Sequence, residues 1–204
     1  MNKKQIRFFS TGFSLILFFF TLFFVIGDIP IIDLIISSKI VNSWESGFDN
    51  IFIFLGIFLK SILVFIALIF ISFLYKQKRK KESLILLVSL LLGYFLENMI
   101  NLIIQRERPS MQLIENFGYS FPSGHAVFSI ILFSLLIYFY KDEIKNKFFK
   151  NLFILTNIFL ILLVGLSRIY LNVHWFTDVI GGFFLGLFVT SLILNLEKSL
   201  AKSL

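Results

Sequence analysis

Long apolar runs separated by short polar segments form the basic pattern of this chain. The runs extend over about 8–26, 51–75, 83–104, 125–140, 149–167 and 176–196. A membrane-spanning helix needs ~20 apolar residues, and the runs approach that length, although 125–140 is short unless its ends extend. The pattern therefore predicts an all-α bundle of six transmembrane helices, forming a single domain over residues 1–204.

The first apolar run resembles a secretory signal peptide, because Lys3, Lys4 and Arg7 precede it. Its length is nevertheless sufficient to span a membrane, and no small-residue cleavage site follows it. We expect this run to be retained as the first span.

The distribution of basic residues predicts the orientation of the bundle. Short loops rich in lysine and arginine stay in the cytoplasm. Fourteen of the 19 basic residues fall on one side of the predicted spans, in the groups Lys3, Lys4, Arg7; Lys76, Lys78, Arg79, Lys80, Lys81; Lys141, Lys145, Lys147, Lys150; and Lys198, Lys202. We therefore expect both termini to be cytoplasmic and the opposite connections to face outward.

The connection over residues 27–50 is neither a span nor clearly polar. Asp28, Asp33 and Lys39 are interspersed among isoleucine, leucine and valine residues. A short helix at the membrane interface fits this pattern. A loop packed on the bundle without lipid contact fits it equally well.

Composition narrows the class of protein and of partner. Hydrophobic residues make up 58% of the chain, charged residues 15%, and the mean hydropathy is +0.92, which exclude an ordinary soluble domain. The net charge of +7 arises from short clusters between apolar runs, so the lipid bilayer rather than nucleic acid is the expected partner. The absence of cysteine excludes disulfides, thiolate catalysis and cysteine-bound metal.

Candidate chemistry concentrates around the only two histidines. His174 and Asp178 are four residues apart, which places them on one helix face, where the carboxylate can accept one ring N–H and leave the other nitrogen free to attack. On its own, such a pair is more often a cap at the start of a helix. Ser167 and Arg168 precede it closely enough to hold an anion near the imidazole.

Two further polar features lie on the same predicted side. Arg108 adds a second guanidinium from another loop, although a lone arginine at a membrane end commonly extends to the lipid headgroups. Ser123, Gly124 and His125 mark the start of an apolar helix, where free N–H groups bind phosphate. A capped helix with an incidental histidine is the alternative for this segment.

Together these segments resemble the type 2 phosphatidic acid phosphatase family of integral-membrane lipid phosphatases, which are related to the vanadium haloperoxidases. The resemblance covers about residues 101–178 and the six-span layout. Three separated motifs in the right order are far more specific than any one of them. The matching residues are Arg108 and Pro109 in the first motif, Pro122, Ser123, Gly124 and His125 in the second, and Ser167, Arg168, His174 and Asp178 in the third.

The resemblance implies a mechanism without metal or other cofactor. His174 would be the nucleophile that takes the phosphoryl group, Asp178 its orienting partner, and His125 the acid that protonates the leaving group. The phosphoryl oxygens would be held by Arg108, Arg168, Ser123 and the Gly124 backbone. Water would then hydrolyse the phosphohistidine.

The first motif departs from the family at one position. The family has a lysine seven residues before Arg108, where this chain has Asn101. Asn101 can still donate a hydrogen bond to substrate, and Arg106 is the nearest candidate to supply the missing cation. Pairing of Arg106 with Glu107 at the surface is equally consistent with the sequence.

Lys60 and Glu97 are charged residues inside predicted spans. Counted at 1.5 Å per residue from the ends of straight helices, both lie at a similar depth, so a direct ion pair is the expected arrangement. The alternative is that Lys60 replaces the family's lysine and reaches the phosphate.

By resemblance, the expected function is hydrolysis of a lipid phosphate or diphosphate on the outer face of the cell membrane. Undecaprenyl diphosphate, phosphatidylglycerophosphate, phosphatidate and lipid A are substrates of similar bacterial proteins. Two alternatives remain: a lipid phosphotransferase that uses the same intermediate, and a lipid-binding protein without catalysis.

Overall fold

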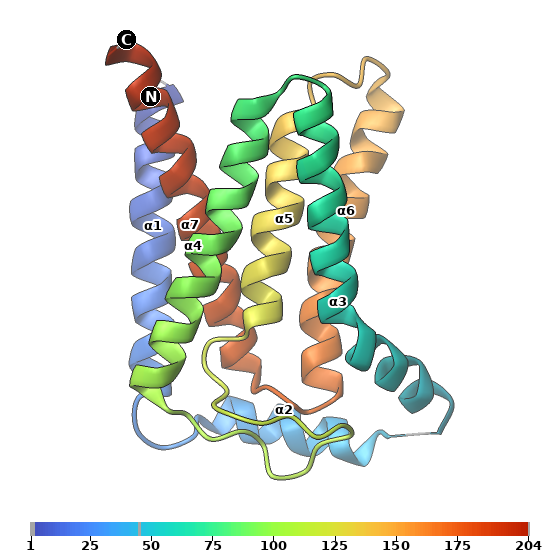
Figure 1. The fold of residues 1–204 in the computed structure, drawn as a ribbon. Coiled ribbons are helices and arrows are strands. Elements are labelled where there is room, and N and C mark those ends of the chain that lie inside the picture. The colour runs from blue at the N-terminus through green and yellow to red at the C-terminus, as the bar shows by residue number, and fades with distance from the viewer. Residues whose placement is uncertain (1–2, 45, 204) are drawn as a thin grey trace.

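The computed structural model describes residues 3–44 and 46–203, and all regular structure in these ranges is α-helical. Figure 1 shows the helices as an upright bundle with one short helix lying across its end. The bounds are α1 Lys3–Val25, α2 Ile31–Asn42, α3 Ser46–Lys76, α4 Lys80–Ile104, α5 Gly124–Tyr140, α6 Lys147–Tyr170 and α7 Phe176–Ser203. The prediction of an all-α fold is confirmed.

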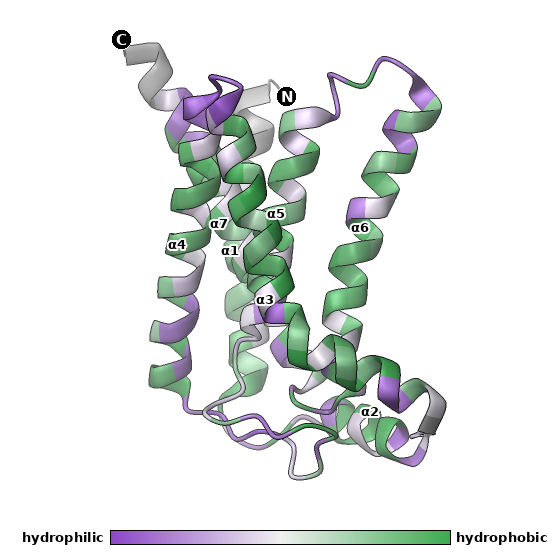
Figure 2. Cartoon of the chain, turned by 45° about the vertical axis from the view of Figure 1, so that its right-hand side comes forward, coloured by the Kyte–Doolittle hydropathy of each residue, from purple (hydrophilic) through white to green (hydrophobic). Residues whose placement is uncertain are grey.

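A helix forms at each of the six predicted apolar runs. In the described residues, four helices are long and apolar enough to cross a membrane, namely α3, α4, α6 and α7, while α1 and α5 contain shorter apolar segments, Phe9–Val25 and Gly124–Tyr140. Figure 2 shows that the long helices are mostly hydrophobic along their length, with hydrophilic residues gathered toward the two ends. The chain is therefore a multi-pass membrane protein, and the count of six spans stays a prediction.

The short helix α5 lies at the centre of the bundle, between α4, α6 and α7. Its side chains are buried around most of its circumference, as expected for a helix that is apolar on all sides. Close packing against α7 requires glycine: a Cβ at Gly182 would lie 2.7 Å from the Ser123 carbonyl oxygen, and one at Gly186 would lie 2.8 Å from that of Val127. This contact fixes the start of α5 against the start of α7.

The two ends of the bundle differ in what they carry. The N- and C-terminal ends of the described chain lie at one end, together with the α3–α4 and α5–α6 connections (Figure 1). The opposite end holds α2, the loop over 105–123 and the turn over 171–175. Both histidine segments thus lie at the end remote from the termini, and the assignment of that end to the outside stays a prediction.

The predicted interfacial segment forms the helix α2, which crosses the end of the bundle and packs on α6 and α7 (Figure 1). Ile31, Ile32, Leu34 and Ile35 are exposed on it, whereas Asp33 is fully buried. The helix is confirmed, and its contact with lipid stays a prediction.

Candidate active site

A pocket of about 400 Å³ opens at the end of the bundle remote from the termini, and it contains both histidines. Its walls come from α3, α4, α5 and the 105–123 loop. The polar lining residues are Lys60, Glu97, Asn98, Asn101, Arg108, Asn116, His125 and His174, and the apolar part includes Leu63, Val64, Tyr94, Val127 and Phe128. The pocket is therefore polar at one side and continues into an apolar space between helices.

His174 lies in the turn between α6 and α7 and is buried. Its Nδ1 is 2.8 Å from the Ser120 carbonyl oxygen, which can only accept a hydrogen bond, so Nδ1 carries the proton. The other ring nitrogen, Nε2, is 3.3 Å from Nη1 of Arg108. His174 thus presents an Nε2 lone pair in the pocket, which is the state that a nucleophile needs.

Asp178 contributes differently from the expectation. The sequence predicted that its carboxylate fixes the His174 tautomer, but Asp178 Oδ2 is 3.6 Å from Nδ1, farther than the Ser120 carbonyl. That Oδ2 instead accepts the Trp175 backbone N–H at 2.8 Å. The backbone of the 105–123 loop therefore provides the nearer acceptor for the Nδ1 proton, and Asp178 adds a negative charge beside the imidazole.

The pKa of His174 reflects these surroundings. Burial lowers the pKa below its ordinary value of 6.5, because the charged imidazolium loses its hydration. Asp178 and the Ser120 carbonyl act in the opposite direction, and the positive charge of Arg108 lowers the pKa further. The balance favours the neutral ring in the absence of substrate.

Arg106 lies away from the position predicted for it. Its Nη2 donates to Asp33 Oδ2 at 2.7 Å, and its Nη1 donates to Thr177 Oγ1 at 2.8 Å and to Asp178 Oδ1. The side chain is 7% exposed and is not part of the pocket wall. The expectation that Arg106 replaces the missing phosphate-binding cation is corrected, since two carboxylates already occupy its guanidinium.

Asp33 is the residue of this network that sequence reasoning missed. It is fully buried and accepts hydrogen bonds from the Thr177 backbone N–H at 2.9 Å and from Thr177 Oγ1 at 2.6 Å, in addition to Arg106. The available signal was a single carboxylate inside the apolar stretch 31–36. The distance of more than 140 residues to Thr177 hid its partner.

Arg108 lies on the pocket wall, as predicted. Its Nε and Nη2 donate to the carbonyl oxygens of Gly118 and Tyr119 at 3.1 and 2.8 Å, and Nη1 donates to that of Val173 at 2.5 Å. Burial lowers the pKa of Arg108, and the charges of Asp178 and Glu97 partly offset this effect. The backbone carbonyls aim the guanidinium at His174 without neutralising its charge.

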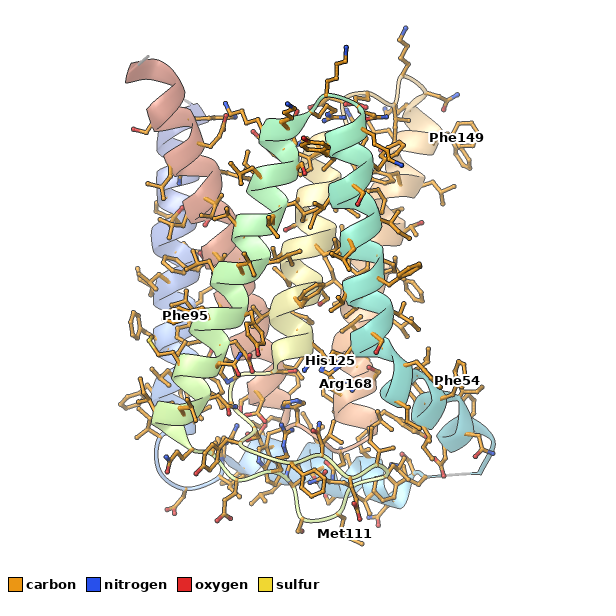
Figure 3. The ribbon with its side chains drawn as sticks, in the orientation of Figure 1. Phe54, Phe95, Met111, His125, Phe149 and Arg168 are labelled. Carbon is orange, nitrogen blue, oxygen red and sulfur yellow. The ribbon has the colours of Figure 1, made fainter. Side chains whose placement is uncertain are left out.

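Arg168 of α6 is 1% exposed, and within the described ranges its guanidinium makes one hydrogen bond, from Nε to Ser167 Oγ at 3.1 Å. Its Nη2 is buried without a partner, as are Ser123 Oγ and His125 Nε2. Arg168 is close enough for its charge to act on His125, and Figure 3 shows both residues at the same end of the bundle. Arg168 and Ser123 are not among the residues that line the open pocket, whereas His125 is.

Gly124 begins α5 and lines the pocket, with Ser123 as a helix cap whose side chain makes no capping hydrogen bond. A Cβ at Gly124 would lie 3.1 Å from the Glu97 carboxyl, so this carboxylate rests against the helix start. A helix N-terminus attracts an anion, and Glu97 takes that place here. Asn101 lines the pocket too, but its Nδ2 donates to the carbonyl oxygens of Tyr119 and Phe121 at 3.0 and 3.3 Å.

The expected ion pair between Lys60 and Glu97 does not form in the described part of the chain, although both residues line the pocket. Glu97 instead accepts a hydrogen bond from Asn98 Nδ2 at 2.9 Å. The depth estimate assumed a straight α3, whereas its first turns lean away from the bundle (Figure 1). Lys60 is therefore closer to the site than counted, and it shares the pocket with Arg108.

The sequence matches one family description, the PAP2 superfamily, over residues 82–200, which is more than half of the chain. Phosphatidylglycerophosphatase B of Bacillus subtilis is 34% identical over 102 residues. The match covers 48% of this chain and 50% of that relative, so the chain spans about half the length of the relative.

Two solved structures have a similar fold. A crystal structure of a transmembrane PAP2-type phosphatidylglycerolphosphate phosphatase from Bacillus subtilis matches with a TM-score of 0.80 and 25% identity, covering 91% of this chain and 96% of that chain. LpxE of Aquifex aeolicus matches with a TM-score of 0.62 and 22% identity, covering 83% and 98%, and this likeness concerns the fold alone.

Proposed function

Because this chain belongs to the PAP2 superfamily, we propose that it is a membrane phosphatase that hydrolyses a lipid phosphate or diphosphate. The observation that carries the proposal is Arg168, a buried guanidinium with no carboxylate partner. A buried charge without a counter-ion costs several kcal/mol, and a buried polar group without a hydrogen bond costs ~1–3 kcal/mol. The unpartnered atoms of Ser123 and His125 add to this cost. A bound phosphoryl group would satisfy all three.

The proposed reaction proceeds in two steps at His174. Nε2 attacks phosphorus, the new N–P bond forms as the P–O bond to the leaving group breaks, and His125 gives a proton to the departing oxygen. Water then attacks the phosphohistidine while His125 takes a proton from it, and the N–P bond breaks to release phosphate. Arg108, which now contacts Nε2, moves onto a phosphoryl oxygen when substrate binds.

Protein cations supply the charge that phosphoryl transfer requires. Arg108 and Lys60 line the pocket, and Arg168 is close enough for its charge to act on His125. Together with the N–H groups at the start of α5, they can neutralise the phosphoryl oxygens without a divalent ion. We therefore propose metal-independent catalysis. Lys60 would supply the cation that replaces the family's lysine, a role that the sequence had suggested for Arg106.

The apolar part of the pocket suits a lipid chain. Leu63 and Val64 of α3 face the space lined by Tyr94 of α4 and Phe128 of α5. The names of the similar Bacillus subtilis proteins point to phosphatidylglycerophosphate as the first substrate to test. Undecaprenyl diphosphate and phosphatidate are the next candidates, since any acyl or prenyl chain fits such a lining.

The deciding experiment uses the full chain purified in detergent, with phosphate release followed from phosphatidylglycerophosphate, undecaprenyl diphosphate and phosphatidate in excess chelator. His174→Ala serves as the inactive control. We expect release from at least one lipid without an added acceptor. Release only with a lipid alcohol acceptor would identify a phosphotransferase, and tight lipid binding without turnover would identify a binding protein. Activity that needs magnesium or zinc would contradict metal independence.

We also propose that the chain forms a single domain in the cell membrane and that its active-site end faces outward. The chain has no cysteine, so single cysteines can report the side of each loop. Ser110 is exposed near the pocket, and Lys80 is exposed at the opposite end of the bundle. In intact cells, an impermeant thiol reagent should label Ser110→Cys and leave Lys80→Cys unlabelled. The reverse pattern would place the site in the cytoplasm.

A further inference from the structure

We propose that Asp33, on the helix that lies across the end of the bundle, is a positioning residue of the active site. It sets the net charge that Asp178 presents to His174 by sharing Arg106 with it. This inference rests on the proposed function, because its catalytic consequence appears only if His174 becomes phosphorylated.

The contacts of Asp33 connect α2 to the nucleophile through one continuous network. Its Oδ2 accepts from Arg106 Nη2 at 2.7 Å, and the same guanidinium donates through Nη1 to Asp178. Asp178 lies 3.6 Å from His174 Nδ1. Asp33 and Asp178 are fully buried and Arg106 nearly so, so their charges interact with little screening by water.

If Asp33 had only a structural role, its hydrogen bonds with Thr177 would be sufficient and the ion pair with Arg106 would not be needed. Two hydrogen bonds from Thr177, at 2.9 and 2.6 Å, already make Asp33 a cap for the start of α7. The additional ion pair with Arg106 places one guanidinium between two carboxylates, so the group retains one negative charge in excess. With Asp178 as its only partner, Arg106 would cancel that charge.

The excess negative charge matters because His174 becomes cationic during the reaction. When Nε2 bonds to phosphorus and Nδ1 keeps its proton, the imidazole ring carries a positive charge. Among the other charged groups, Arg108 of the 105–123 loop acts on His174 with a positive charge. Lys60 of α3 and Glu97 of α4 line the same pocket with opposite charges, Arg168 of α6 acts on the neighbouring His125, and the described side chains of α1 contain no titratable group. The Asp33 network is thus the main support for a cationic ring.

Asp33→Asn tests this role. The amide has nearly the same shape, so its oxygen can still accept the Thr177 backbone N–H, while the negative charge and the acceptor for Arg106 Nη2 disappear. We expect kcat to fall about tenfold or more, with KM within about threefold because Asp33 does not line the pocket. The pKa of His174 should fall further, and the acid limb of kcat/KM should therefore move to lower pH.

The chain has only two histidines, so a ¹⁵N-histidine NMR titration can follow His174 independently of activity. Asp49→Asn is the matched control, since Asp49 is a carboxylate at the same end that accepts a hydrogen bond from Tyr170 Oη at 2.9 Å and lies outside the network. It should leave the His174 titration and kcat unchanged. Asp33→Glu, which keeps the charge, should leave the titration at the wild-type pH while lowering kcat through displacement of Arg106.

The outcomes separate the two proposals. A wild-type protein that releases no phosphate from any lipid counts against the proposed function, and the NMR titration still tests Asp33. Asp33→Asn with an unmoved His174 titration would overturn the inference, whether or not kcat falls, because lost activity alone would indicate only a structural cap. If Asp33→Asn does not fold, Asp33→Glu decides, and wild-type kcat in that variant would overturn the positioning role.

Discussion

Two groups of charged residues flank His174, and they differ in how their charges are balanced. On one side Asp33, Arg106 and Asp178 satisfy one another through ion pairs in a buried network. On the other side Arg108, Arg168 and Lys60 have no carboxylate partner in the described ranges. Both groups lie at the same end of the bundle, so membrane depth does not explain the difference.

The difference separates charges that keep the geometry of the site from charges that can bind an anion. A buried ion pair whose members are both present keeps its geometry, and removing one partner leaves a charge that nothing compensates. A buried cation without a partner is costly in the free protein and becomes favourable only when an anion arrives. This difference supports the proposal that the paired group positions His174 and that the unpaired group binds the phosphoryl oxygens.

Replacing the nucleophile should produce the largest effect. His174→Ala removes the atom that forms the covalent bond, and neither group of charges can substitute for it. We expect phosphate release to fall about a thousandfold or more, while thermal unfolding in detergent stays close to wild type. Activity within tenfold of wild type in a folded variant would refute the proposed mechanism.

Arg168 and Arg106 should respond to the same substitution with opposite changes in stability. Arg168→Met removes an uncompensated buried charge, so we expect the melting temperature without substrate to rise by a few degrees, while kcat/KM falls about a hundredfold. Arg106→Met leaves two buried carboxylates unpaired, so we expect the melting temperature to fall. Thermal unfolding and phosphate release on both variants provide the measurement. Equal destabilisation by both changes would remove the distinction between the groups.

Removing the charge of Asp178 should have a smaller effect, visible in the pH profile. Catalysis needs the neutral form of His174, so kcat/KM falls as pH drops below the His174 pKa. Asp178 raises that pKa, and Asp178→Asn should therefore move the acid limb to lower pH. Because the Ser120 carbonyl still holds the tautomer at 2.8 Å, we expect kcat to fall only about ten- to a hundredfold. A limb that moves to higher pH would contradict this assignment.

The sequence predicted the helices well, because they depend on local patterns, and the roles of the motif residues stay predictions. Apolar runs fixed the helix positions, and the segment 119–125 meets the turn over 171–175 at one pocket, as expected. The errors all concerned distant partners. Asp33 pairs with Arg106 across 73 residues, and only the three-dimensional structure brings them together.

The errors at Lys60 and at the His174 tautomer have the same origin. The depth of Lys60 depends on how far α3 leans from the bundle, which its apolar sequence does not encode. The proton on His174 depends on a backbone carbonyl, and any residue type at position 120 would supply one. Sequence reasoning therefore predicted which residues gather at one pocket more reliably than which atoms each one contacts.

Replacing Lys60 should have the smallest of these effects on activity. The result decides to which of the two groups Lys60 belongs. Its side chain lines the pocket but is largely exposed, so solvent screens its charge more than that of Arg168. Lys60→Met should lower kcat/KM about tenfold, roughly the value of one charge-assisted hydrogen bond, with little change in melting temperature. Lys60→Arg should recover most of the activity.

The matched control is Lys76→Met, at the C-terminal end of the same helix and outside the pocket lining. It changes the same side chain on α3 without altering the pocket, and it should retain wild-type activity. A Lys60→Met variant that is destabilised but fully active would mean that Lys60 serves the structure through Glu97, as the sequence first suggested. A stable variant with a tenfold loss places Lys60 among the unpaired cations, because a cation that binds only the charge of the substrate can be removed without lowering the stability of the free protein.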